Sequence, residues 1–270
     1  MSAITSHSRR YWIAGAAIFA VAAGAYGIGR VYPPLGPTSG AMAVAQGYVE
    51  NLAGEEIPDR GRYVLVDAAS ARLFMIEDGR VRDTMRVIVG KPAAATPALR
   101  SELNYATINP YWNVPTDLAQ TLIAPRVLKD GAVYLTDRGY EIVSSFADGK
   151  LIPPDSVDWA AVAAGKVTVH VRQRPGAANS MGQMKFSLVD GSGIYLHDTP
   201  KKELFALAER NLSNGCVRLE DAPRFARWLL GDDPPLASAP PEQHVALPAA
   251  VPIAIAYLDA KAQMRVAGLQ

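Results

Sequence analysis

Cysteine and histidine are scarce in this chain. Its 270 residues include one cysteine, Cys216, and four histidines. A single cysteine excludes an intrachain disulfide framework and any metal cluster held by several thiolates. A metal site would need carboxylate ligands beside the few imidazoles. We therefore predict neither a bound metal nor another cofactor.

The chain also has no excess of charge of either sign. It carries 27 lysines and arginines against 26 acidic residues, a formal net charge of +1. Because a nucleic-acid-binding surface normally needs a basic excess, we expect no nucleic-acid partner. Apolar residues make up 49% and charged residues 20%, which is typical of a folded chain. The length predicts one large domain or two modest ones.

A long uncharged run lies near the N-terminus, from Tyr11 to Gly29, with basic residues on both sides. At about 1.5 Å per residue, such a helix nearly spans a bilayer core. The flanking basic residues argue against a buried core helix and favour a cytoplasmic N-terminus. We predict a membrane anchor over 1–30. A cleavable signal peptide, cut near Ala23-Gly24-Ala25, and a twin-arginine-like signal at Ser8-Arg9-Arg10 are the alternatives.

The rest of the sequence predicts a mainly β domain over 60–262, between a linker over 31–59 and a tail over 263–270. Short apolar runs bounded by turn signals indicate strands. These runs cover 63–67, 73–77, 81–89, 106–108, 132–136, 167–171, 185–189, 193–196 and 251–258. A turn at Asp78-Gly79 makes the first three an antiparallel meander.

Three segments predict helices, over 155–164, 200–212 and 222–230. The second has Thr199 as its cap, a proline in its first turn and an apolar stripe. The third has its large apolar residues on one side and a glycine at its end. A proline-rich segment over 232–248 predicts a loop before the last strand.

One cysteine and one histidine are the candidates for chemistry. Cys216 follows Gly215, which allows a tight turn that can aim amide N–H groups at an acyl oxygen. Arg218 shares a face with Cys216 if this segment is extended, and it suits a substrate carboxylate. His197, at a predicted strand end, is the candidate base. The chain between His197 and Cys216 must double back for the two side chains to meet.

Each of these residues also has an ordinary structural interpretation. A lone cysteine is more often a small buried hydrophobe, and a lone histidine or arginine is more often a satisfied or solvated side chain. An unpaired cysteine in an exported protein favours the reactive interpretation. Residue types alone leave both interpretations open. His170 has no nucleophile near it in sequence, and we interpret it as structural.

The order of these residues resembles the L,D-transpeptidase catalytic (YkuD-like) family, and its YcbB-like branch most closely. The hallmark is a His followed by Ser/Thr-x-Gly-Cys-x-Arg, matched here by His197 and Ser213-Asn214-Gly215-Cys216-Val217-Arg218. Asn214 stands where many members carry a second His. The resemblance covers roughly 60–260, with further matching stretches at 89–92, 96–97, 108–115, 172–182 and 251–258.

The resemblance implies a mainly β (β-rich α+β) fold, an L,D-transpeptidase-like β-barrel or sandwich with short helices. Residues 137–184 would be an insertion capping the cleft. In the implied site Cys216 is the nucleophile and His197 the base, and the main-chain carbonyl of Asp198 orients the imidazole. The backbone N–H groups of Gly215 and Cys216 would hold the oxyanion, with that of Asn214 as a further candidate.

The implied activity is a peptidoglycan L,D-transpeptidase that cross-links stem peptides through a Cys thioester and is a carbapenem target. Tetrapeptide stems would be donor and acceptor, and the membrane a partner through the N-terminal helix. The expected location is the bacterial cell envelope, either anchored in the inner membrane with the catalytic domain in the periplasm or exported after signal cleavage. The implied substrate-binding residues are Arg218, Tyr195, Ser213, Asn214 and Asn179.

Other functions compete with this interpretation. With water as acceptor, the same site would be an L,D-carboxypeptidase or endopeptidase. A sortase places its Arg further beyond Cys, and a papain or NlpC-type peptidase has Cys before His, whereas only His244 follows Cys216 here. An inactive wall-binding module would not need the intact His197, Cys216 and Arg218.

Overall fold

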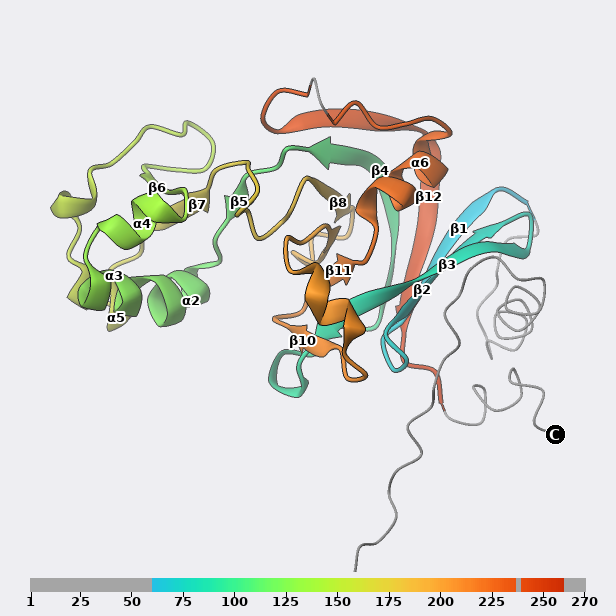
Figure 1. Cartoon of the computed structure of the whole chain (residues 1–270), viewed down its shortest axis with the longest axis horizontal. Coiled ribbons are helices and arrows are strands. Elements are labelled where there is room, and N and C mark those ends of the chain that lie inside the picture. Colours follow the sequence, from blue (N-terminus) through green and yellow to red (C-terminus); the bar gives the residue numbers. More distant parts are fainter. Residues whose placement is uncertain (1–59, 237–238, 260–270) are drawn as a thin grey trace, which may run out of the picture. The chain divides into compact units, whose positions relative to one another are not determined.

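The computed structural model describes residues 60–236 and 239–259 (Figure 1). The predicted anchor over 1–30, the linker over 31–59 and the tail over 263–270 lie outside these residues. Within the described ranges, no helix has the length and apolar character needed to cross a membrane.

A nine-stranded sheet forms the larger part of the described structure. Its order is β10-β3-β11-β9-β8-β4-β12-β1-β2, and β2 also pairs with β3. Because β3 pairs with β2 along its first half and with β11 and β10 along its second, the sheet closes on itself as a barrel does. Its strands are β1 Arg62–Asp67, β2 Arg72–Glu77, β3 Arg80–Gly90, β4 Leu99–Ile108, β8 Met184–Leu188, β9 Tyr195–His197, β10 Asn211–Ser213, β11 Val217–Leu219 and β12 Gln243–Ala256.

The predicted antiparallel meander is confirmed in β1, β2 and β3. Asp78 and Gly79 both have positive φ, 53° and 68°, the backbone of a two-residue hairpin turn. The mainly β fold class is confirmed as well. The local turn signal was sufficient here because adjacent strands need only that turn to pair.

The main core fills one face of this sheet. Five residues in mutual register across neighbouring strands point into it: Val217, Leu196, Phe186, Ala106 and Val245. Helix α6 Ala222–Leu230 packs Phe225 and Leu229 into the same cluster. This helix is confirmed as predicted, and it ends at Gly231, whose φ is +80°. The opposite face of the central strands is left for polar side chains.

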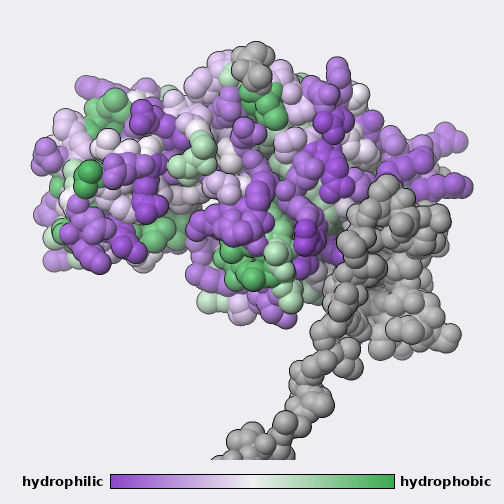
Figure 2. All heavy atoms as spheres, in the orientation of Figure 1, coloured by the Kyte–Doolittle hydropathy of each residue, from purple (hydrophilic) through white to green (hydrophobic). Residues whose placement is uncertain are grey.

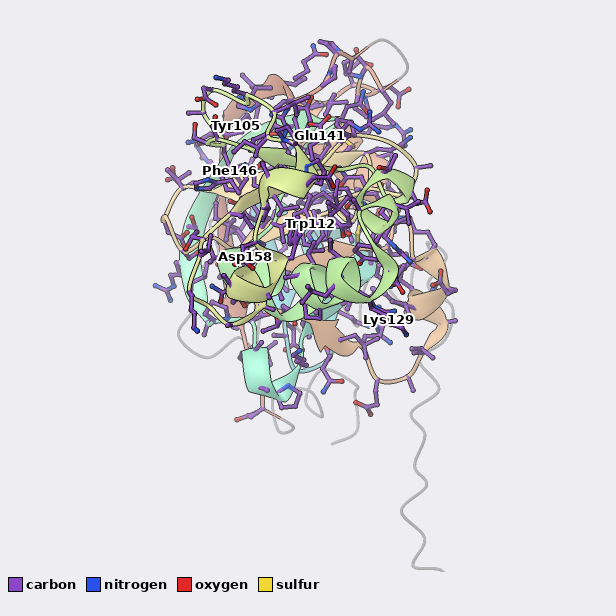
Figure 3. The ribbon with its side chains drawn as sticks, turned by 90° about the vertical axis from the view of Figure 1, so that its left-hand side faces the viewer. Tyr105, Trp112, Lys129, Glu141, Phe146 and Asp158 are labelled. Carbon is purple, nitrogen blue, oxygen red and sulfur yellow. The ribbon has the colours of Figure 1, made fainter. Side chains whose placement is uncertain are left out.

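A second, three-stranded sheet of order β5-β7-β6 lies between β4 and β8 in sequence, with its own apolar cluster (Figures 1 and 3). Its strands are β5 Trp112–Asn113, β6 Tyr140–Val143 and β7 His170–Gln173. Its helical segments are α2 Thr116–Leu118, a π-helical turn Ala119–Ile123, α3 Ala124–Asp130, α4 Val133–Asp137, the 3-10 turn η3 Pro154–Ser156 and α5 Trp159–Ala163. The unit begins before the range 137–184 that was predicted as an insertion. In Figure 2 the visible surface of this unit is mostly hydrophilic, as expected when its apolar residues fill a buried cluster.

Three sequence-based expectations were wrong. The strand predicted over 132–136 is part of α4, where Leu135 is buried in the smaller cluster. The loop predicted over 232–248 overlaps the start of β12, which pairs with β4 on both sides of an irregularity that accommodates Pro248.

The third concerns the helix predicted over 200–212, which is only a 3-10 helix, η4 Lys202–Ala206, followed by β10. Arg210 is the physical reason. Its buried guanidinium donates hydrogen bonds to the carbonyls of Ser70, Ala71, Val87, Leu207 and Ala208, which draws the chain out of the helix. Tertiary hydrogen bonds to distant segments therefore override the local helical pattern.

Candidate active site

The candidate nucleophile and base lie on two neighbouring parallel strands. In the β9–β11 pair, Leu196 is opposite Val217 and His197 is opposite Arg218. Since Leu196 and Val217 point into the core, His197 and Arg218 share the opposite face. The chain between the two strands thus doubles back as expected, through η4 and β10 and not through a long helix.

Cys216 immediately precedes β11 and extends the same alternation. Its thiol donates a long hydrogen bond, 3.9 Å, to the carbonyl oxygen of Gly193, and the backbone N–H of Tyr195 on β9 acts to lower the pKa of the thiol. His197 is opposite Arg218, and Cys216 lies two residues before Arg218 on the same face. Diagonal neighbours of this kind on adjacent strands have Cα atoms about 8 Å apart, and their side chains can meet across that distance. The half-buried thiol and the imidazole of His197 are therefore on one face of one strand pair.

The imidazole of His197 is held in one tautomer. Its Nδ1 lies 2.5 Å from the main-chain carbonyl oxygen of Asp198, as the resemblance implied. A carbonyl only accepts, so Nδ1 carries the hydrogen and Nε2 keeps its lone pair. Burial, together with the positive charge of Arg218, lowers the pKa of His197 to about 4. The ring is neutral at neutral pH and Nε2 is free to accept a proton.

The thiol of Cys216 is also neutral at rest. Burial raises its pKa, although the Tyr195 N–H and the charge of Arg218 favour the thiolate. A neutral thiol beside a neutral imidazole is arranged for general-base activation, with the proton moving to Nε2 as the sulfur attacks.

Arg218 is the candidate anion-binding group. The Nε atom of its half-buried side chain is buried and, within the described part of the chain, has no hydrogen-bond partner. Burial lowers the pKa of the guanidinium, and a Cys216 thiolate would oppose that shift. A guanidinium that is desolvated without a carboxylate partner is suited to bind an anionic ligand group.

Hydrogen bonds within the loop before Cys216 set its shape. The Ser213 hydroxyl donates to the Cys216 carbonyl at 2.6 Å and accepts the Gly215 N–H at 3.1 Å. Gly215 has φ of +120°, a conformation that favours glycine. These contacts show how the loop is held. The Gly215 N–H bonds to the Ser213 hydroxyl, and Ser213 is buried within the loop. The roles of Gly215 in holding the oxyanion and of Ser213 in binding substrate stay predictions. Asn214 between them is exposed.

Thr96 anchors this loop to the end of β3, a contact that sequence reasoning missed. Its hydroxyl donates to the Gly215 carbonyl at 2.7 Å and accepts the Gly90 N–H at 2.8 Å. A Cβ at Gly90 would lie 2.1 Å from the Ala94 carbonyl oxygen, so only glycine fits. The Tyr257 hydroxyl donates to the Thr96 carbonyl. Two neighbouring stretches of the family resemblance, 89–92 and 96–97, therefore meet the stretch 251–258 around the cysteine loop.

Asn179 does not face the candidate site. It is 1% exposed, and its amide nitrogen donates to the carbonyls of Pro110, Gln173 and Arg174. Its Oδ1 accepts the Met181 N–H at 2.7 Å. These bonds use the side chain to hold the connection between the two sheets, and a contact of Asn179 with substrate stays a prediction.

The polar face extends beyond His197 across the sheet. Residues in mutual register there are Arg218, His197, Lys185, Thr107 and His244. Tyr195 is half-buried on this face, and burial, followed by the proximity of Cys216, raises the pKa of its hydroxyl. The ammonium of Lys185 pairs with Glu242 at 2.7 Å and lies 5.8 Å from the Tyr195 ring. Lys185 is a charged neighbour of the site that the motif did not indicate.

His170 and His244 make contacts of their own, away from Cys216. His170 pairs with Val143 in the smaller sheet, with its ring edge-on to Phe146 at 5.0 Å between centroids (Figure 3 labels Phe146). His244 stacks on Tyr105. In the described ranges no group of three or more His, Cys, Asp or Glu side chains is arranged to hold a metal ion.

Comparison with known proteins places these residues in a family. Residues 61–242 match the family model described as the L,D-transpeptidase catalytic domain, YkuD. The chain belongs to this family. A curated Haemophilus influenzae protein named as an L,D-transpeptidase is 36% identical over 174 residues, which cover 64% of this chain. The chain spans 35% of the length of that relative.

Solved structures of L,D-transpeptidases are similar at low identity. L,D-transpeptidase 3 from Mycobacterium tuberculosis is 13% identical with a TM-score of 0.36, over 73% of this chain and 61% of that one. The catalytic domain from the E. faecium L,D-transpeptidase is 13% identical with a TM-score of 0.32, over 75% of this chain and 100% of that one.

Proposed function

We propose that this protein is a peptidoglycan L,D-transpeptidase that cross-links stem peptides through a thioester on Cys216. One observation carries the proposal. The parallel pairing of β9 and β11 puts His197, Arg218 and the preceding Cys216 on one face, with Nδ1 of the imidazole on the Asp198 carbonyl. Family membership supports the substrate class.

The acylation step follows from the neutral pair. The Cys216 sulfur attacks the acyl carbon at the L-centre of the third residue of a donor tetrapeptide, while its proton passes to His197 Nε2. A C–S bond forms and the carbonyl oxygen becomes an oxyanion. Collapse of this intermediate breaks the C–N bond, and the departing D-Ala amine takes the proton from Nε2. The carbonyl of Asp198 stabilises the imidazolium in between, as the third group of a triad does.

The second step regenerates the thiol. An amine of the acceptor stem attacks the thioester, gives its proton to His197, and forms a new amide as the C–S bond breaks. The sulfur then recovers the proton. We assign the oxyanion to the N–H of Cys216, with that of Asn214, because Ser213 already accepts the Gly215 N–H. Removal of one such donor typically costs about 3 kcal/mol.

We place this activity in the bacterial cell envelope. The substrate class requires a location outside the cytoplasm, and the uncharged run from Tyr11 to Gly29 supports inner-membrane anchoring or export after cleavage. The capping of the cleft by residues 137–184 is part of the same proposal.

Product analysis tests the proposed reaction. Purified protein incubated with isolated tetrapeptide muropeptides is expected to give cross-linked dimers together with released D-Ala, identified by chromatography and mass spectrometry. Shortened monomers without dimers would instead identify an L,D-carboxypeptidase, and intact substrate would contradict both activities.

Arg218→Ala is expected to weaken donor binding with little loss of stability. A hydrogen bond to a charged group contributes about 1.5–3 kcal/mol, so the donor concentration for half-maximal acylation should rise roughly 10- to 100-fold. Removing this charge leaves no carboxylate unpaired, because Arg218 makes no ion pair among the described residues. Acylation kinetics and thermal unfolding measure the two effects separately. A lower melting temperature with unchanged kinetics would make Arg218 a scaffold residue.

A further inference from the structure

The side chain of Lys202 joins the strand that carries the base to the strand that follows the nucleophile. Lys202 begins η4, and its ammonium donates to Oδ1 of Asp198 at 2.6 Å. The same ammonium donates to the carbonyls of Glu220 at 2.8 Å and Leu219 at 3.4 Å. Asp198 directly follows β9, and Leu219 and Glu220 end and follow β11. One cation therefore connects the C-terminal ends of both catalytic strands.

The carboxylate of Asp198 is confined on its other side by backbone. Its Oδ2 accepts the Gln183 N–H at 2.9 Å, and the Asp198 N–H donates to the Met184 carbonyl at 2.9 Å. Gly182 has φ of +62°, and a Cβ there would lie 2.3 Å from Oδ2. The residue whose carbonyl accepts the Nδ1–H of His197 is thus held through both its main chain and its side chain.

These contacts differ from those of an ordinary surface ion pair, which contributes only about 0–1 kcal/mol to stability. The Asp198 side chain is 9% exposed, and two of the three acceptors of Lys202 are main-chain carbonyls. The pair also lines a cavity of about 430 Å³ whose lining includes Arg86, Phe205 and Glu220 but neither His197 nor Cys216. On the cavity side the ion pair with Lys202 holds the Asp198 carboxylate, while the backbone of Gln183 and Met184 holds the residue on the other side.

We infer that Lys202 is a positioning residue for His197. Acting through the Asp198 carboxylate, it fixes the main-chain carbonyl that keeps the hydrogen on Nδ1 and presents Nε2 to the sulfur of Cys216. The significance of this inference for catalysis rests on the proposed function, but the arrangement itself can be tested without a peptide substrate.

The test uses the full chain and two readouts. The first is the ¹⁵N spectrum of histidine-labelled protein, with the His197 signals assigned from their loss in a His197→Gln variant. The second is the rate of alkylation by iodoacetamide, which reports on Cys216 alone because it is the only cysteine. The variants are Lys202→Met and Lys202→Arg. Lys201→Met is the matched control, since Lys201 is adjacent and exposed and the charge change is identical.

Lys202→Met is expected to give a mixture of His197 tautomers and to slow alkylation about tenfold at pH 7. The loss is smaller than the full contribution of a general base, about 100- to 10,000-fold, because His197 is still present. Lys202→Arg and Lys201→Met should keep the Nδ1–H tautomer and the wild-type rate. If Lys202→Met retains the tautomer and the rate, even with a lower melting temperature, Lys202 is only structural and the inference is overturned.

A second variant covers the case in which Lys202→Met does not fold. Asp198→Asn keeps the shape packed against Gly182 and removes the charge that Lys202 contacts, so it should give the same tautomer mixture and slower alkylation. A wild-type spectrum in this variant would also overturn the inference. Because neither readout needs a donor stem, failure of the wild-type protein to make muropeptide dimers would leave these results interpretable.

Discussion

Cys216→Ala is expected to abolish the mass increase that a carbapenem adds to the wild-type protein. The sulfur is the only thiol in the chain, and no other nucleophile is paired with His197 in the described site. Wild-type protein should gain one adduct per chain, because a carbapenem carbonyl takes the place of the donor acyl group. Intact-protein mass spectrometry measures both.

The fold of this variant should be unchanged. The thiol is half-buried and donates only a long hydrogen bond, 3.9 Å, to the Gly193 carbonyl, so replacement by a methyl group removes little packing. Thermal unfolding within a few degrees of wild type is the control, since about 1 kcal/mol shifts the midpoint by roughly 2–4 °C in a domain of this size. A full adduct on folded Cys216→Ala would remove Cys216 from the mechanism.

The parts of the fold that could be predicted from sequence depend on neighbours in the chain. The meander needs only the turn at Asp78-Gly79, and α6 carries its own signals, with Asp221 accepting the Arg224 N–H at its start and Gly231 at its end. In each case the residues that determine the structure lie within a few positions of it. Periodicity and capping were therefore sufficient.

The elements that were predicted wrongly depend on distant partners. Residues 207–212 belong to the segment predicted as a helix over 200–212. However, Arg210 bonds to carbonyls of the β1–β2 turn and β3, more than 100 positions upstream, and Asn211–Ser213 pair with the end of β3. The segment over 132–136 has strand-forming residues, but burial of Leu135 against α3 and α5 makes it helical. No local pattern reports such contacts.

The candidate site divides in the same way. His197, Cys216 and Arg218 carry a motif, and the structure places them on one face. The contacts that hold them in place could not be read from the motif, although Thr96 lies in a matching stretch. Thr96 reaches the Gly215 carbonyl across 119 positions, and Lys202 bonds to Glu220 across 18. Asn179 also lies in a matching stretch, and its buried side chain bonds to the main chain on both sides of the connection between the sheets, which the sequence did not indicate.

His197→Gln is expected to slow acylation of Cys216 at neutral pH by about 100- to 10,000-fold, the usual contribution of a general base. Glutamine has a similar volume and can still contact the Asp198 carbonyl, but it cannot take up a proton. The sulfur must then react as a thiolate formed by loss of its proton to solvent. Because burial raises the pKa of the thiol, little thiolate is present at pH 7.

The pH dependence distinguishes the two enzymes. In the wild type, Nε2 is unprotonated above its pKa of about 4, so the acylation rate should be flat from about pH 5 to 8 and should fall only as the pH drops through about 4. In His197→Gln the rate should rise about tenfold per pH unit over that range, since it follows the thiolate fraction. The wild-type advantage therefore shrinks as the pH rises, and stopped-flow acylation by a carbapenem at several pH values measures it.

His170→Gln is the matched control, because it makes the same replacement in the smaller sheet, where the imidazole contacts Phe146. It should acylate at the wild-type rate with the wild-type pH profile. If the acylation rate were independent of pH in His197→Gln and rose with pH in His170→Gln instead, His170 would be the general base. Since His197, and not His170, has its Nδ1 on a carbonyl that two strand ends hold in place, we expect the slope only in His197→Gln.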